Sequence, residues 1–134
     1  MSDRRFARTE MLLGSAGVEQ LGRCSVAVFG IGGVGSYAAE ALARAGVGRL
    51  TLVDHDVIDM TNINRQIHAL TETIGAPKTE TMARRIHAIN PACDVREIRA
   101  FYQPEDAEDF FPERYDYVLD AVDTVTAKVD LAVQ

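Results

Sequence analysis

Two isolated cations, Arg65 and Lys78, are the side chains whose surroundings most suggest binding chemistry. Arg65 lies alone in the compact polar run of residues 61–66, whereas Lys78 follows a Gly-Ala-Pro break at residues 75–77 and begins a helical pattern. An arginine grips phosphate oxygens through a planar fork, while a lysine acts as a point charge. Two such cations on separate segments suit a triphosphate better than a pyrophosphate.

Three aspartates follow apolar runs at points where a strand would end. Asp54 lies 24 positions after Gly30, close to where nucleotide-binding folds place an acid on the ribose. Asp56 fits a nucleotide site and fits equally a turn that its own side chain stabilises. Asp123 suits a divalent cation that bridges phosphates, and its alternative role is to cap a helix beginning at Thr124.

A glycine-rich run, GIGGVG at residues 30–35, must position these charges. It follows an apolar run and leads into a helical stretch, which is the context that the G-x-G-x-x-G fingerprint requires. Gly30 permits a tight turn, and Gly35 lets the helix pack on the strand. Gly32 and Gly33 let the backbone approach a phosphate. The first helical turn then offers unpaired N–H groups to an anion.

The apolar periodicity predicts a Rossmann-like α/β fold, doubly wound, with a mainly parallel sheet and helices on both faces. Strands are expected at residues 25–29, 49–53, 94–98 and 115–121, and helices at 36–45, 78–89 and 103–112. Residues 1–24 should form two short N-terminal helices, and residues 25–134 the nucleotide-binding core. The helical pattern runs to Gln134 without a cap, which predicts the N-terminal portion of a longer protein.

Composition limits the class of protein. A chain of 134 residues, 47% hydrophobic and 25% charged, is typical of one globular domain. Its net charge of -6 argues against broad nonspecific binding of nucleic acid. Two cysteines without metal-ligand spacing favour a reducing, cytoplasmic compartment. No apolar run approaches the roughly 20 residues of a membrane span.

The sequence pattern favours structural rather than ligand-binding roles for two arginines and three histidines: Arg84, Arg85, His55, His68 and His87. The arginines lie within an amphipathic helical pattern, which favours a solvated face. The histidines have no mutual spacing and no obvious carboxylate partner, which favours packing or surface positions over ligand roles.

Several motifs occur in one order: RFAR, GIGGVGS, LVDHD, TNINRQ, GAPK, INP and DAVDT. Together they resemble the ThiF, MoeB and ubiquitin-like-protein-activating superfamily across essentially all 134 residues. Within it, EALARAGVG, TNINRQIHAL and RIHAINP most resemble the branch of tRNA threonylcarbamoyladenosine dehydratases. The resemblance implies that a carboxylate is adenylated with ATP and Mg²⁺, that pyrophosphate is released, and that the threonyl group on tRNA then cyclises.

The resemblance also implies roles for individual residues. Gly33 and its neighbours approach the ATP phosphates, and Asp54 holds the ribose. Asn62, Arg65 and Gln66 contact ATP.

The resemblance also implies which residues balance the charge of the phosphates and bind the metal ion. By this resemblance Arg65 and Lys78 are expected to neutralise the charge of the phosphates, and Asp123 resembles the Mg²⁺ ligand. Arg8, a solvated charge by spacing alone, resembles an arginine that reaches the ATP of the neighbouring subunit in a homodimer.

Other functions remain open. One is activation of a ubiquitin-like sulfur carrier such as ThiS or MoaD, and a cysteine-desulfurase system is a possible partner by family resemblance. Another, from a different class, is a nucleotide-sensing interaction domain without chemistry. An NAD-dependent dehydrogenase is less favoured, because it leaves Arg65, Lys78 and Asp123 without a shared purpose.

Overall fold

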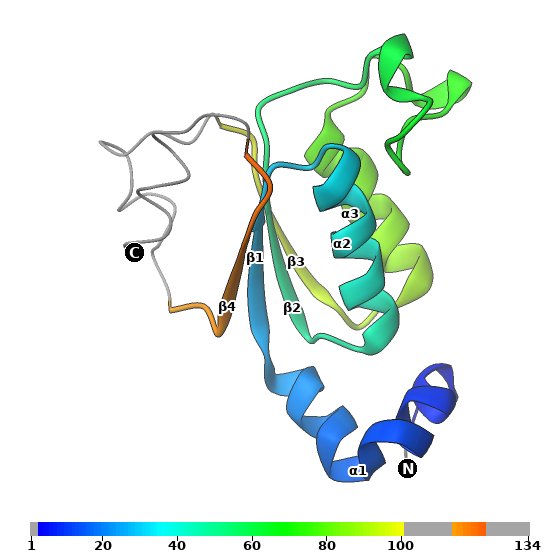
Figure 1. Ribbon diagram of the computed structural model, residues 1–134, viewed down its shortest axis with the longest axis vertical. Helices are drawn as coiled ribbons and strands as arrows, with labels where there is room; N and C mark the ends of the chain where they lie inside the picture. Colours follow the sequence, from blue (N-terminus) through cyan, green and yellow to red (C-terminus); the bar gives the residue numbers. More distant parts are fainter. Residues whose placement is uncertain (1–2, 101–113, 123–134) are drawn as a thin grey trace.

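A computed structural model describes residues 3–100 and 114–122, and its centre is a parallel four-stranded sheet in the order β3-β2-β1-β4 (Figure 1). The strands are β1 (Ser25–Phe29), β2 (Arg49–Val53), β3 (Asp94–Ile98) and β4 (Tyr117–Asp120). The first three match the predicted bounds, whereas β4 is shorter than predicted. The parallel Rossmann-like fold is confirmed.

The helices are α1 (Ala7–Arg23), α2 (Gly33–Ala45) and α3 (Lys78–Ile89), with short 3-10 turns η1 (Arg4–Phe6), η2 (Met60–Asn62) and η3 (Thr71–Thr73). The helix α1 bends at Gly14, whose φ is 77°, so it consists of two helical pieces as predicted. It contains no buried residue. The predicted helices at 103–112 and from Thr124 lie outside the described residues.

Both crossover helices, α2 and α3, cover the same face of the sheet (Figure 1). This follows from right-handed crossovers, since the chain moves in one direction from β1 to β2 to β3. It then returns past β1 to β4, so the winding reverses between β1 and β4. Ligands of open α/β sheets bind beyond the carboxyl ends of the strands at such a reversal.

Alternating side chains of the strands fill two apolar clusters. On the helical face, strand residues such as Val28 and Leu52 pack with Ala39, Met82 and Ile86. On the opposite face the cluster is formed by Ala27, Phe29 and Val53. Burial on both faces explains why β1 is a nearly continuous apolar run.

Two glycines allow α2 to start directly on the turn after β1. Gly30 has a φ of 92°, and a Cβ added there would lie 2.5 Å from the carbonyl oxygen of Ala121. A Cβ on Gly35 would lie 1.7 Å from the carbonyl oxygen of Gly30. The predicted steric roles of both glycines are therefore confirmed. The helix begins at Gly33, three residues before the predicted start at Ser36, because the turn itself supplies its first residues.

Candidate nucleotide site

The glycine turn lies at the carboxyl edge of the sheet, next to the end of β2. The N–H of Gly30 donates to the carbonyl of Val53 at 2.8 Å. Gly32 occupies the N-cap position of α2, and among the residues that the structure describes no side chain caps the first helical turn. The first-turn N–H groups of a helix are a favourable place for an anion. A turn built in this way can receive a phosphate.

Asp54 is fixed by the turn and by the residues that follow it. One carboxylate oxygen accepts from the N–H of Ile31 at 2.7 Å, and the other accepts from the N–H of Asp56 at 2.8 Å. Each carboxylate oxygen has a second lone pair. The half-buried carboxylate therefore has a defined position from which it can still accept from ribose hydroxyls.

Asp56 contacts two basic side chains. Its Oδ1 lies 3.1 Å from Nε2 of His55, and its Oδ2 lies 3.9 Å from Nζ of Lys78. The prediction that His55 has no carboxylate partner is therefore wrong, because the turn after β2 brings the two neighbouring side chains together. Ligand atoms of Asp54, His55 and Asp56 lie within 4.8 Å of one another, close enough to share a metal ion.

The predicted polar run begins with the compact turn η2. Asp59 accepts hydrogen bonds from the backbone and side chain of Thr61, at 2.9 and 2.5 Å, and these bonds hold the pKa of Asp59 below its usual value. The side-chain oxygen of Asn62 accepts from the N–H of Asp59 at 2.8 Å. The buried Asn62 therefore stabilises the fold of this segment. The family resemblance had implied only a contact with ATP for this residue.

Arg65 and Gln66 lie directly against the glycine turn. A Cβ on Gly33 would be 3.7 Å from Cγ of Arg65, and one on Gly32 would be 3.7 Å from Nε2 of Gln66. Nη1 of Arg65 donates to the carbonyl of Thr61 at 3.1 Å. Oε1 of Gln66 is buried and has no hydrogen-bond partner among the described residues. This buried acceptor beside the helix start could receive a hydrogen bond from a donor group of a polar ligand.

Lys78 reaches this edge because two loop segments pair. The N–H of Ile58 donates to Ala76 at 2.8 Å, and the N–H of Lys78 donates to Asp56 at 3.1 Å. Lys78 is thus the first residue of α3, and its side chain is only 8% exposed. Its one ion pair among the described residues is the 3.9 Å contact with Asp56. A buried ammonium with so distant a partner is well suited to meet an anionic ligand.

The structure gathers ten predicted site residues at the carboxyl edge of β1 and β2: Gly30, Gly32, Gly33, Gly35, Asp54, Asp56, Asn62, Arg65, Gln66 and Lys78. Asp123 lies outside the described residues, although the preceding chain up to Ala121 packs against Gly30. Arg8 is exposed on α1, and this helix lies beyond the opposite end of the sheet (Figure 1). Its assignment to a neighbouring subunit stays a prediction.

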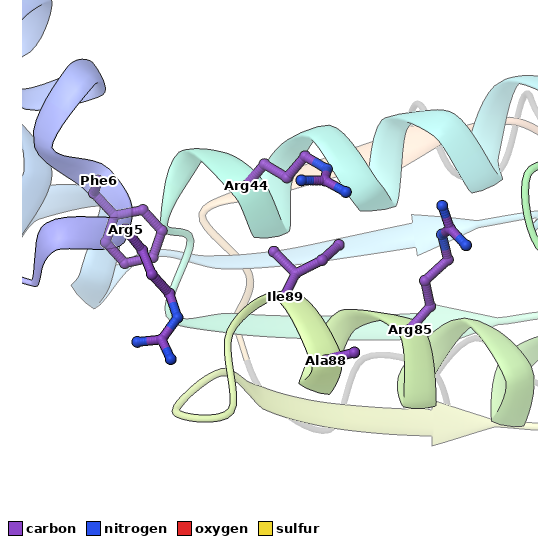
Figure 2. A pocket seen from close by; sticks show the side chains of 6 residues that line it. All are labelled: Arg5, Phe6, Arg44, Arg85, Ala88 and Ile89. Atoms are coloured by element: carbon purple, nitrogen blue, oxygen red, sulfur yellow. The ribbon is translucent and has the colours of Figure 1, made fainter.

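A separate basic hollow of about 530 Å³ is lined by Arg5, Phe6, Arg44, Arg85, Ala88 and Ile89 (Figure 2). It lies between η1 and the C-terminal halves of α2 and α3, and none of the predicted site residues lines it.

The structure confirms the prediction of a solvated side chain for Arg84 and contradicts it for Arg85. Arg84 is solvated, as predicted, and pairs with Glu80 at 3.3 Å. Arg85, also predicted to be solvated, instead binds the buried Glu40 of α2, which also accepts from Arg44 at 3.2 Å. Burial opposes ionisation of Glu40, but the hydrogen bonds and charges of Arg85 and Arg44 outweigh it and keep its pKa low.

His68 is a buried contact of the turn that sequence reasoning treated only as a packing or surface histidine. It is 1% exposed, and its Nε2 lies 2.8 Å from the carbonyl oxygen of Ile31. Its one sequence signal was its place two residues after Gln66. The cysteines lie elsewhere and are free, and burial raises the pKa of the Cys93 thiol to about 11, so this thiol is a poor nucleophile.

Burial of His68 predicts a stability change with pH. Burial, more than any other cause, holds the pKa of His68 below its ordinary value of 6.5. The unfolded chain therefore binds a proton that the folded chain does not, and the free energy of unfolding falls as the pH drops below about 6.5. Urea titrations at about pH 7.5 and 5.5 should show a smaller loss in His68→Gln than in the exposed-site control His87→Gln. Equal losses in both variants would contradict this origin.

Known proteins resemble this chain in sequence and fold. The tRNA threonylcarbamoyladenosine dehydratase of Bacillus subtilis is 53% identical over 127 residues, covering 95% of this chain and 50% of that protein. The crystal structure of E. coli tRNA N6-threonylcarbamoyladenosine dehydratase, TcdA, in complex with ATP is 45% identical, with a TM-score of 0.93, covering 96% of this chain and 53% of that one.

A sulfur carrier protein adenylyltransferase of Thermus thermophilus is more distant, at 37% identity over 121 residues, covering 89% of this chain and 44% of that protein. The chain spans about half the length of the curated dehydratases from B. subtilis and E. coli. No helix in the described residues is both long and apolar enough to cross a membrane. The ThiF family profile matches residues 6–134, and the chain therefore belongs to the ThiF family.

Proposed function

We propose that this chain binds ATP over the glycine turn and forms the adenylating part of a tRNA threonylcarbamoyladenosine dehydratase. The observation that carries the proposal is the placement of Arg65 against Gly33 and of the buried Lys78 beside Asp56. The dehydratase names of the most similar relatives, at 45–53% identity, support the substrate class.

In the proposed reaction an oxygen of the threonyl carboxylate attacks the α-phosphorus of ATP. The bond from that phosphorus to the oxygen that bridges to the β-phosphorus breaks, and pyrophosphate leaves with the electron pair. Arg65 and Lys78 stabilise the charge that develops on this leaving group. The first-turn N–H groups of α2 hold the phosphates without needing to move.

Adenylation changes what the acyl carbon can expel. A carboxylate cannot expel oxide, whereas an acyl adenylate expels AMP. A nucleophile of the same modified nucleoside then attacks the acyl carbon and closes a ring, so the nucleoside loses the elements of water. Asp54 and its neighbours serve in both steps by keeping the nucleotide in place.

A divalent cation fits the oxygen-rich edge of this site. Mg²⁺ binds through one or two carboxylates together with phosphate oxygens, and when bound it would neutralise phosphate charge. We assign Asp123 as its protein ligand, following the family motif. Asp54 and Asp56 add carboxylates at the same edge.

The second candidate is activation of a ubiquitin-like sulfur carrier, which would share the same adenylation step. The 37% identity to the Thermus thermophilus adenylyltransferase supports this second candidate. The 53% identity to the Bacillus subtilis dehydratase favours the first. Either reaction would take place in the cytoplasm, and a cysteine desulfurase would be a further partner only by family resemblance. The third candidate is a nucleotide-sensing domain.

ATP–pyrophosphate exchange in the complete natural protein separates these functions. We expect exchange that depends on tRNA carrying threonylcarbamoyladenosine and is absent with unmodified tRNA. Exchange that instead depends on a ThiS-like or MoaD-like carrier would establish the second candidate. ATP binding without exchange in the presence of either substrate would favour the sensing domain.

We further propose a homodimer in which Arg8 reaches the ATP of the partner. Two observations favour a partner for α1: it buries no residue, and it exposes Met11, Leu12 and Leu13 by 76%, 87% and 53%. Arg8 lies on the same helix and is exposed.

Mixing of inactive variants tests this arrangement. Arg8→Ala and Lys78→Ala proteins, each nearly inactive, should regain up to about a quarter of wild-type activity after subunit exchange, because half of the dimers would be hybrids with one intact site. The matched control mixture contains Lys78→Ala and Arg84→Ala proteins. Because Arg84→Ala keeps both Arg8 and Lys78, its own dimers should be active before any subunit exchange. Failure to regain activity, despite exchange shown by mass, would contradict the shared site.

A further inference from the structure

The peptide groups on both sides of Ile31 are held by side chains from other segments. The N–H of Ile31 donates to Asp54 at 2.7 Å, and its carbonyl oxygen lies 2.8 Å from Nε2 of His68. A carbonyl oxygen can only accept, so Nε2 must be the protonated nitrogen of the ring. Ile31 is fully buried, and it is the residue that joins Gly30 to Gly32.

Fixing the carbonyl of Ile31 also fixes the next N–H. The described chain has no cis peptide bond, and in a planar trans peptide the carbonyl and the N–H point in opposite directions. Because the carbonyl of Ile31 faces His68, the N–H of Gly32 faces away from the ring. Gly32 has no Cβ, so a ligand can approach this N–H closely.

The cost of this arrangement indicates that the histidine does more than fill space. Its Nδ1 is buried without a hydrogen-bond partner among the described residues. An apolar side chain of similar size would avoid that unsatisfied nitrogen but would leave the Ile31 carbonyl unpaired. The hydrogen bond also ties the turn to the segment that carries Arg65 and Gln66, as does the 3.3 Å bond from Ile67 N–H to Ser36.

We propose that His68 is a positioning residue that orients the Gly32 amide toward the phosphates of the bound nucleotide. The proposal rests on the proposed ATP site and adds a residue that touches neither nucleotide nor carboxylate substrate. The two contacts of Ile31 then relate to different parts of the ligand. Asp54 serves the nucleoside, whereas the hydrogen bond between His68 and the Ile31 carbonyl serves the phosphates. Loss of the hydrogen bond from His68 should therefore weaken binding of ATP and leave binding of adenosine unchanged.

The test compares three substitutions of His68 in the complete natural protein by calorimetric titration with ATP and with adenosine. A glutamine amide reaches about as far as Nε2, whereas an asparagine amide reaches only about as far as Nδ1. We expect His68→Leu and His68→Asn to weaken ATP binding about tenfold or more, as for loss of one charge-assisted hydrogen bond. His68→Gln should stay within about threefold of wild type, and adenosine binding should change little in all three.

Two results would overturn the inference. One is ATP binding by His68→Leu and His68→Asn that matches wild type. The other is equal weakening of ATP and adenosine, which a general collapse of the site would produce. The Asn and Gln variants, both polar, carry the comparison if His68→Leu does not fold. A wild-type protein that binds adenosine but gains nothing from the phosphates would overturn the proposed ATP site as well.

Discussion

Lys78→Ala is expected to slow ATP–pyrophosphate exchange by about a hundredfold or more. Lys78 is the buried cation at the start of α3, and its ion pair with Asp56 spans 3.9 Å. If the ammonium stabilises charge on the departing pyrophosphate, its removal acts on the transition state more than on binding of the substrate. The fall should therefore appear mainly in kcat, and less in the KM for ATP.

Arg84→Ala provides a matched control on the same helix. Arg84 is also cationic, but it is solvated and pairs with Glu80 one turn away. Its removal should leave exchange within about twofold of wild type, since exposed pairs of this kind contribute little. Thermal melting of both variants checks that each is folded. Lys78→Ala with unchanged exchange would remove Lys78 from the site.

Gly35→Ala is expected to destabilise the fold by about 3 kcal/mol or more, measured by urea denaturation. The added methyl would lie 1.7 Å from the carbonyl oxygen of Gly30, and that atom belongs to backbone. Relief requires α2 to move away from β1, which would also disturb the uncapped helix start that is proposed to bind phosphate.

Gly22→Ala is the control for a glycine without such a contact. Gly22 lies in α1, and apart from its neighbours and the backbone of its own helix no atom of the described residues lies within 4 Å of an added Cβ. Alanine is the better helix former, so this change should stabilise the protein by about 0.5–1 kcal/mol. Similar effects of the two substitutions would show that close packing at Gly35 does not limit stability.

The sequence allowed prediction of the features that depend on local pattern. Apolar runs interrupted by glycine indicated β1 and β2 at their observed bounds, and the break before Lys78 indicated the start of α3. The rule that parallel strands end at one edge was sufficient to bring Asp54 and the glycine turn together. The start of α2 was missed by three residues, because the glycines belong to both turn and helix.

Contacts between elements were not predictable in the same way. The bond of Arg85 to Glu40 depends on how α3 lies against α2, and a helical pattern fixes only which residues share a face. The contact of His68 with Ile31 depends on the path of the loop after β2, which has no periodicity to extrapolate. His55 was misjudged because its partner, Asp56, is its sequence neighbour in a turn.

We propose that the glycine turn, Arg65 and Lys78 together hold the phosphates of ATP. A crystal structure of the complete natural protein with a non-hydrolysable ATP analogue would show where these phosphates lie. We expect phosphate oxygens within hydrogen-bond distance of the N–H groups of Gly32 and Gly33 and of the side chains of Arg65 and Lys78. An analogue bound instead in the hollow lined by Arg5, Arg44 and Arg85 would contradict it.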